Sequence, residues 1–146
     1  MKQVIIIGFL AAGGLATLVY GASTPQSAER TVNEGVYTSA QADRGAQVVE
    51  DYGCRNCHGA TLEGGAEEEP PLWGEEFIGN WSGRKVSELA EKITTMPANA
   101  DPGYQVKPAA APDVVAFLLR ANGFPAGKTE LPADTNTLSR IKIVAP

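Results

Sequence analysis

Apolar and small residues recur along the middle of the chain with the spacing of α-helix faces. Each group below occupies positions i, i+3, i+4 and i+7, which lie on one side of a helix. The three faces are Ala42, Gly45, Ala46 and Val49; Val86, Leu89, Ala90 and Ile93; and Val114, Phe117, Leu118 and Ala121. No convincing strand-like alternation precedes the C-terminal tail. The pattern predicts an all-α domain with three main helices and long loops.

Capping signals border these three segments. Residues 38–41 read Thr-Ser-Ala-Gln, which has the spacing of a capping box, and this first helix is expected to end near Tyr52. Ser82 is a candidate N-cap for the second segment. The third has Pro112 in its expected first turn and Asn122 before a glycine at its expected end.

The N-terminus predicts export. A short start with one lysine is followed by an apolar run from Val4 to Tyr20 and then by small residues. This order is typical of a secretory signal peptide, although the run is also long enough for an uncleaved membrane anchor. Either reading places the rest of the chain outside the cytoplasm.

The composition divides the chain into four parts. Residues 1–22 are the signal peptide or anchor, 23–37 a polar linker, 38–127 the domain and 128–146 an irregular tail. Three apolar residues are expected to hold the tail against the domain: Leu138, Ile141 and Ile143.

The formal net charge of −5 narrows the choice of partners. Nucleic-acid binding is excluded because phosphates attract a basic surface, which this chain lacks. An acidic surface favours a protein partner that carries a basic docking patch.

The clearest chemical motif is the run from Cys54 to His58, which reads Cys-Arg-Asn-Cys-His. It contains both cysteines and the single histidine of the chain. Two thiols at this spacing can add to the two vinyl groups of one haem edge, and the adjacent imidazole can then bind the iron. The motif predicts one covalently attached haem c held by Cys54 and Cys57, with His58 as an iron ligand.

Three other interpretations of the motif remain open. A thioredoxin-like thiol pair would need a βαβ context, which the pattern does not show. A structural zinc site would need a carboxylate as its fourth ligand, because only three Cys or His residues exist. The third interpretation is a chance occurrence of the motif, in which both cysteines are buried free thiols.

Met96 is the candidate second iron ligand. It is the only methionine besides the initiator, and no second histidine exists. Pro97 disfavours helical geometry at Met96, so the helix should end there and leave the thioether in a loop. The alternatives are a core methionine that fills a packing gap, or a five-coordinate haem in a sensor or enzyme.

Several stretches together resemble the class I c-type cytochromes. The resemblance covers about Thr38 to Gly127. This stretch is most similar to small bacterial periplasmic cytochromes that accompany quinoprotein alcohol dehydrogenases. The residues that carry it are Arg44-Gly45, Cys54 to Gly59, Pro70-Pro71-Leu72, Trp81-Ser82-Gly83, Thr94 to Pro97 and Asn122 to Gly127.

This resemblance implies further roles. Gly45 would let the first helix cross closely over the last one at Phe117. Pro70, or else Pro71, would accept the His58 ring N–H through its carbonyl. Leu72 would pack on the haem face.

The resemblance also suggests groups for the haem propionates. Trp81 would donate its indole N–H to one of them, or else be a plain core residue. Arg84 and Lys85 would neutralise propionates or remain solvated. One departure from the family is the Pro/Ala-rich stretch from Gln105 to Ala111, which leaves the start of the last helix uncertain.

The expected function is one-electron transfer and not catalysis, because ligands on both sides of the iron leave no position for a substrate. By resemblance, the redox partners would be a dehydrogenase, a terminal oxidase or another cytochrome in the periplasm. The alternative arrangement is a membrane-anchored cytochrome subunit within a larger complex.

Overall fold

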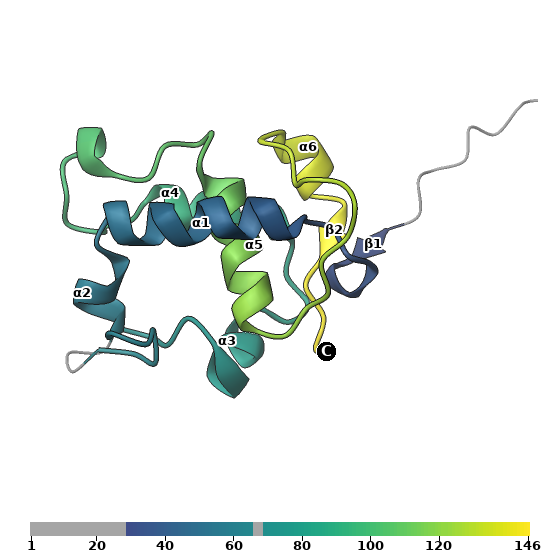
Figure 1. The fold of residues 1–146 in the computed structure, drawn as a ribbon, viewed down its shortest axis with the longest axis horizontal. Helices are drawn as coiled ribbons and strands as arrows, with labels where there is room; N and C mark the ends of the chain where they lie inside the picture. Colours follow the sequence, from purple (N-terminus) through teal and green to yellow (C-terminus); the bar gives the residue numbers. More distant parts are fainter. Residues whose placement is uncertain (1–28, 66–68) are drawn as a thin grey trace, which may run out of the picture.

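The computed structural model describes residues 29–65 and 69–146, which form a small, mostly helical domain with about four main helices (Figure 1). The predicted signal peptide or anchor lies outside the described residues. A tiny parallel sheet and shorter helical turns complete the fold. The elements are β1 (Arg30–Thr31), η1 (Val32–Glu34), α1 (Ser39–Asp51), α2 (Cys54–His58), α3 (Gly74–Trp81), α4 (Val86–Thr94), η2 (Pro102–Tyr104), α5 (Ala111–Ala121), α6 (Thr135–Leu138) and β2 (Ile141–Lys142).

Helix α1 begins where its capping signal predicts. The Thr38 hydroxyl accepts a hydrogen bond from the Gln41 backbone N–H at 3.1 Å. The Gln41 side chain does not complete a capping box. Its amide is buried, donates to the Leu131 carbonyl at 2.9 Å and accepts from the Leu131 N–H at 2.8 Å. The start of α1 is therefore tied to the C-terminal tail.

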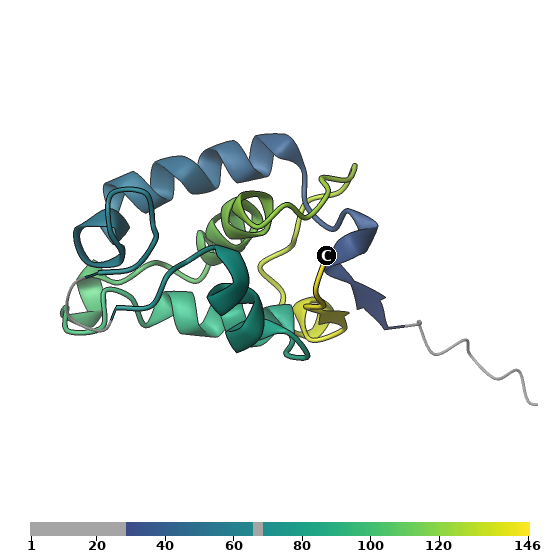
Figure 2. The same cartoon turned by 90° about the horizontal axis from the view of Figure 1, so that it is seen from below.

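Helices α1 and α5 cross in close contact at Gly45 (Figures 1 and 2). A Cβ atom at Gly45 would lie 1.9 Å from the Asp113 carbonyl oxygen and 2.8 Å from the Phe117 Cβ. No side chain larger than hydrogen fits there without moving backbone. The close crossing expected at Phe117 is confirmed.

An ion-pair network covers this crossing. The Arg44 guanidinium donates to both carboxylate oxygens of Asp113 on α5, each at 3.1 Å, and to Glu130 in the tail at 2.8 and 3.0 Å. Hydrogen bonds to Glu130 and then Asp113 raise the pKa of Arg44, and Arg44 lowers the pKa of the Glu130 carboxyl. One side chain thereby joins α1, α5 and the tail.

Helix α5 starts at Ala111 with Pro112 in its first turn. The Pro/Ala-rich stretch before it therefore does not delay the helix. Asn122 is the C-cap and Gly123 follows in the left-handed region at φ 80°, so the predicted stop is also confirmed.

Helix α4 contains the second predicted face, and its four residues Val86, Leu89, Ala90 and Ile93 are all buried. The predicted N-cap, Ser82, is wrong. The N-cap is Lys85, whose backbone N–H donates to the Glu88 carboxylate at 2.9 Å. Ser82 instead closes α3, because its N–H donates to the Ile78 carbonyl.

Helix α3 was not predicted. It has eight residues, and of these only Phe77 is fully buried. Two turns with a single buried residue give no i, i+3, i+4, i+7 repeat, so the sequence pattern does not reveal the helix.

The prediction of a polar linker over residues 23–37 is wrong for residues 29–37, the part that the structure describes. Val32, Val36 and Tyr37 are buried, and the Tyr37 hydroxyl donates to the Phe124 carbonyl at 2.7 Å. Burial raises the pKa of this phenol. Residues 29–37 therefore belong to the packed body.

The tail is held to the body as predicted, because Leu138, Ile141 and Ile143 are buried. It also forms an unpredicted element, since β2 pairs in parallel with β1 through Arg30 opposite Ile141 and Thr31 opposite Lys142. Both ends of the described domain thus lie side by side (Figures 1 and 2).

Within residues 29–65 and 69–146, each helix is too short or too polar to cross a lipid bilayer.

The Gly45 crossing gives a stability prediction. Gly45→Ala should lower the free energy of unfolding by about 2–3 kcal/mol, because the new methyl group meets the α5 backbone. Gly79→Ala is the matched control, since Gly79 lies in α3 with no atom within 4 Å of an added Cβ. That change should be neutral or stabilising by up to about 1 kcal/mol. Urea unfolding measures the change in the free energy of unfolding for both variants. Equal changes for Gly45→Ala and Gly79→Ala would contradict the close crossing.

Candidate functional site

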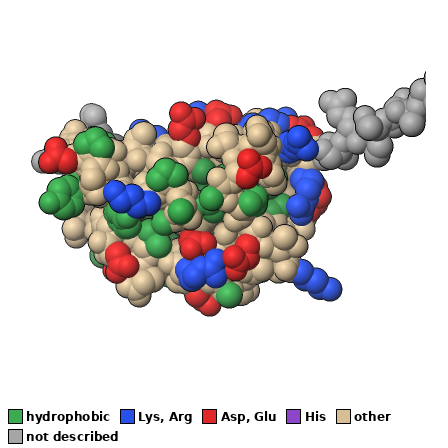
Figure 3. Space-filling view, turned by 90° about the horizontal axis from the view of Figure 1, so that it is seen from above, with side chains coloured by type: hydrophobic (Ala, Val, Ile, Leu, Met, Phe, Trp, Pro, Cys, Tyr) green, Lys and Arg blue, Asp and Glu red, His purple; other side chains and the backbone are tan. Residues whose placement is uncertain are grey.

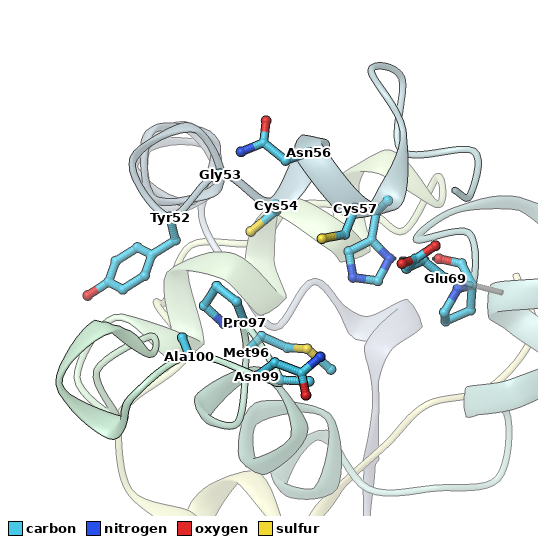
Figure 4. A pocket seen from close by; sticks show the side chains of 13 residues that line it. Tyr52, Gly53, Cys54, Asn56, Cys57, Glu69, Met96, Pro97, Asn99 and Ala100 are labelled. Carbon is cyan, nitrogen blue, oxygen red and sulfur yellow. Dashed lines mark hydrogen bonds between the residues drawn. The ribbon is translucent and has the colours of Figure 1, made fainter. Parts of the chain in front are cut away.

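Helix α2 presents both cysteines on one side. It is a single short helix that follows Gly53, which adopts a left-handed φ of 63° and turns the chain away from α1. Positions i and i+3 of a helix project in similar directions. Figure 4 shows the Cys54 and Cys57 thiols facing the same cavity, and the two cysteines form no disulfide.

The His58 imidazole is oriented by a backbone carbonyl. Its Nδ1 lies 2.8 Å from the Pro70 oxygen. A carbonyl only accepts, so Nδ1 carries the proton and donates. In the neutral ring, Nε2 then keeps its lone pair for a metal ion. Of the two prolines considered for this contact, Pro70 makes it.

Met96 lies across the cavity from the cysteines (Figure 4). Helix α4 ends at Thr94, so Met96 and Pro97 lie in the following loop, as predicted. The cavity has a volume of about 590 Å³. Its lining residues are Tyr52, Gly53, Cys54, Asn56, Cys57, His58, Glu69, Pro70, Met96, Pro97, Ala98, Asn99 and Ala100.

A second, deeper cavity of about 100 Å³ adjoins the first, because both are lined by Cys54, Pro70 and Met96. Leu72 and Trp81 line the deeper cavity. All seven predicted site residues therefore lie around these two adjoining cavities. The deeper walls are mainly apolar and include Val49 of α1, Phe77 of α3, Leu89 and Ile93 of α4, and Val114 and Leu118 of α5.

Arg84 and Lys85 line neither of these two cavities. Arg84 pairs with Glu88 at 2.9 Å, and its guanidinium lies 4.6 Å from the centre of the Trp81 ring. Lys85 pairs with Glu29 at the start of the described chain. Arg84 therefore supports the outside of the Trp81 wall.

The polar groups that do line the deeper cavity are Lys92 and Asn80. Neither residue was predicted from the sequence. Lys92 had a usable signal, because it precedes Met96 by four positions and lies on α4 beside the buried Ile93. Asn80 had none, because α3 was not predicted.

Asn122 has a second role besides ending α5. Its side-chain amide donates to the Leu72 carbonyl at 3.1 Å, and its oxygen accepts from the Gly74 N–H at 3.0 Å. It thus fixes the segment that carries Leu72 into the cavity. The sequence indicates a helix end at Asn122 but not this long-range contact.

The competing interpretations of the motif gain little support. Burial raises the pKa of the Cys54 thiol, whereas a thiol active in disulfide exchange needs a lowered pKa. The parallel β1–β2 pair involves neither α2 nor its neighbours. Among the described residues, no group of three or more His, Cys, Asp or Glu side chains is arranged to hold a metal ion.

Comparisons with protein-family models, with curated proteins and with solved structures found no match in any of the three. The site is therefore interpreted from its own residues and their geometry.

The Asn122 contacts give a second stability prediction. Asn122→Ala should lower the free energy of unfolding by about 1–3 kcal/mol, because a partly buried carbonyl and N–H lose their partner. Asn33→Ala is the matched control, since its amide makes one exposed bond of 3.3 Å to Ala145, and it should change stability by less than about 0.5 kcal/mol. Thermal unfolding compares the two, and similar losses would argue against the Asn122 clamp.

Proposed function

We propose that this chain is an electron-transfer protein with one covalently attached haem c. Cys54 and Cys57 hold the group, and His58 and Met96 bind its iron. The observation that carries the proposal is the hydrogen bond from His58 Nδ1 to the Pro70 carbonyl. It leaves Nε2 available as a ligand in a cavity that two thiols and one thioether also face.

The donor set and the cavity fit a haem. The main cavity has a size typical of ligand and cofactor sites, and its deeper extension is mostly apolar, as a macrocycle requires. The Cys54 and Cys57 thiols, which lie one turn apart on α2, can reach one edge of a haem. An imidazole and a thioether that line the same cavity match the ligand pair of electron-transferring c-type haems.

A bound haem supplies reversible one-electron chemistry at its iron. The chain's own residues adjust that chemistry. The Pro70 carbonyl fixes the ring orientation of His58 and increases the basicity of its ligating nitrogen. The soft Met96 sulfur favours the reduced iron and raises the reduction potential. An iron bound by both His58 and Met96 would have no position left for a substrate, so the proposed chain is an electron carrier and not an enzyme.

The surface favours short-lived protein complexes. Acidic and basic side chains alternate with apolar ones on the face drawn in Figure 3, so this face has no block of a single charge sign. Several basic groups are neutralised in ion pairs, among them Arg44, Arg55, Arg84 and Arg120. The proposed partners are a dehydrogenase as donor and an oxidase or another cytochrome as acceptor, each in a small interface.

The proposed location is the periplasm, reached through the N-terminal apolar segment. A cleaved leader gives a free carrier, and a retained one gives the tethered subunit considered above. The motif and the described cavity are the same in both arrangements.

Covalent attachment gives the third prediction. The mass of the denatured, exported protein should exceed that of the polypeptide by one haem, and the group should survive denaturing electrophoresis. Cys54→Ser with Cys57→Ser should lose it, since no other thiol exists. The mass spectrum of the same protein also shows whether residues 1–22 are present. A wild-type mass without haem would refute the proposal.

The Met96 ligand gives the fourth prediction. The oxidised wild-type protein should show the weak long-wavelength band of a thioether–iron bond, and the reduced protein should bind CO slowly. Met96→Ala should lose the band and bind CO rapidly, because the iron would lose its second protein ligand. Val115→Ala shortens a buried side chain of α5 that lines neither cavity, and this control should keep the band. Rapid CO binding by the wild type would favour the five-coordinate sensor or enzyme.

A further inference from the structure

The backbone around Met96 is held by two residues that follow it along the chain. The Gln105 side-chain amide donates to the Thr95 carbonyl at 3.1 Å and lies 3.5 Å from the Pro97 carbonyl. Between these two contacts, the Val106 N–H donates to the Met96 carbonyl at 2.9 Å. Three successive carbonyls, including that of Met96 itself, thus accept from residues 105 and 106.

These two residues are themselves fixed. Val106 is only 2% exposed and lines the deeper cavity together with Met96. Gln105 is half-buried beside it. The pair stands shortly before α5, the helix that crosses α1 at Gly45. The contacts to residues 95–97 therefore come from a segment that the buried Val106 side chain holds against the domain.

The Met96 segment has weak support of its own. Helix α4 ends at Thr94, and the next N–H groups make only short-range turns, from Thr95 to Lys92 and from Met96 to Ile93. Such turns do not determine which way a loop side chain faces. The bonds from residues 105 and 106 are the tertiary contacts of this backbone that set its position relative to the cavity.

We propose that Gln105 is a positioning residue, which holds the carbonyls on both sides of Met96 and so keeps the thioether directed into the cavity. This inference rests on the proposed function, because it concerns the iron ligand named there. Gln105 touches neither a cofactor nor the iron, and it acts only through the Met96 backbone.

Two substitutions test the role. Gln105→Ala removes the amide, and Gln105→Glu keeps its size but replaces the two donor hydrogens by an acceptor that faces two carbonyls. Gln47→Glu is the matched control, because the Gln47 amide bonds Asp51 on the surface of α1. Thermal unfolding of each haem-loaded protein identifies a temperature at which all of them are folded, and measurements are made there.

The readouts are the thioether–iron band and the rate at which the reduced protein binds CO. Loss of one or two hydrogen bonds should raise the population with Met96 detached, and hence the CO rate, about tenfold. Gln105→Glu should show the larger effect and a weaker band. Gln47→Glu should stay within about twofold of the wild type.

Two results would overturn the inference, and they can be told apart. If both Gln105 variants bind CO at the wild-type rate while Met96→Ala binds it rapidly, Gln105 has no positioning role and the proposed function stands. If the wild type has no thioether–iron band and binds CO as fast as Met96→Ala, the ligand assignment fails and the inference fails with it.

Discussion

The close crossing of α1 and α5 at Gly45 is the contact on which the rest of the structure depends. It brings the two helix axes near enough for Val49 of α1 and Val114 and Leu118 of α5 to form adjoining walls of the deeper cavity. It also holds α1 against α5, and the Cys54–His58 turn follows the end of α1 after Gly53. A methyl group at this position would separate the helices and with them the walls of the site.

The site adds directional contacts to this packed frame. Backbone carbonyls orient both proposed iron ligands in different ways, since Pro70 accepts from the His58 ring whereas the carbonyls around Met96 are held from residues 105 and 106. Apolar packing alone would allow the imidazole and the loop to rotate. Hydrogen bonds with defined partners restrict these rotations, which matters because ligation requires atoms to be placed within tenths of an ångström.

Features that depend on neighbouring residues could be predicted from the sequence, whereas features that depend on contacts between distant residues could not. Helix faces such as Val86 to Ile93 repeat locally, and Met96-Pro97 limits its own backbone, so both were predictable. The short α3 and the pairing of Arg30 with Ile141 depend on residues distant in the sequence, and no local pattern encodes them. The same reason explains why Asn80 and the Asn122 contacts to Leu72 and Gly74 were missed at the site, whereas the thiols and the imidazole were found from their spacing.

The pairing of β1 with β2 has a consequence for biogenesis. A chain is made from its N-terminus, so Arg30 and Thr31 must wait for Ile141 and Lys142 before the sheet can close. Cys54 and Cys57 are presented long before that. While the tail is still missing, the body is incomplete because Leu138, Ile141 and Ile143 have not yet packed. Under the proposed function, an exported chain that arrives N-terminus first would present both thiols to a haem-attaching enzyme before the tail completes the domain.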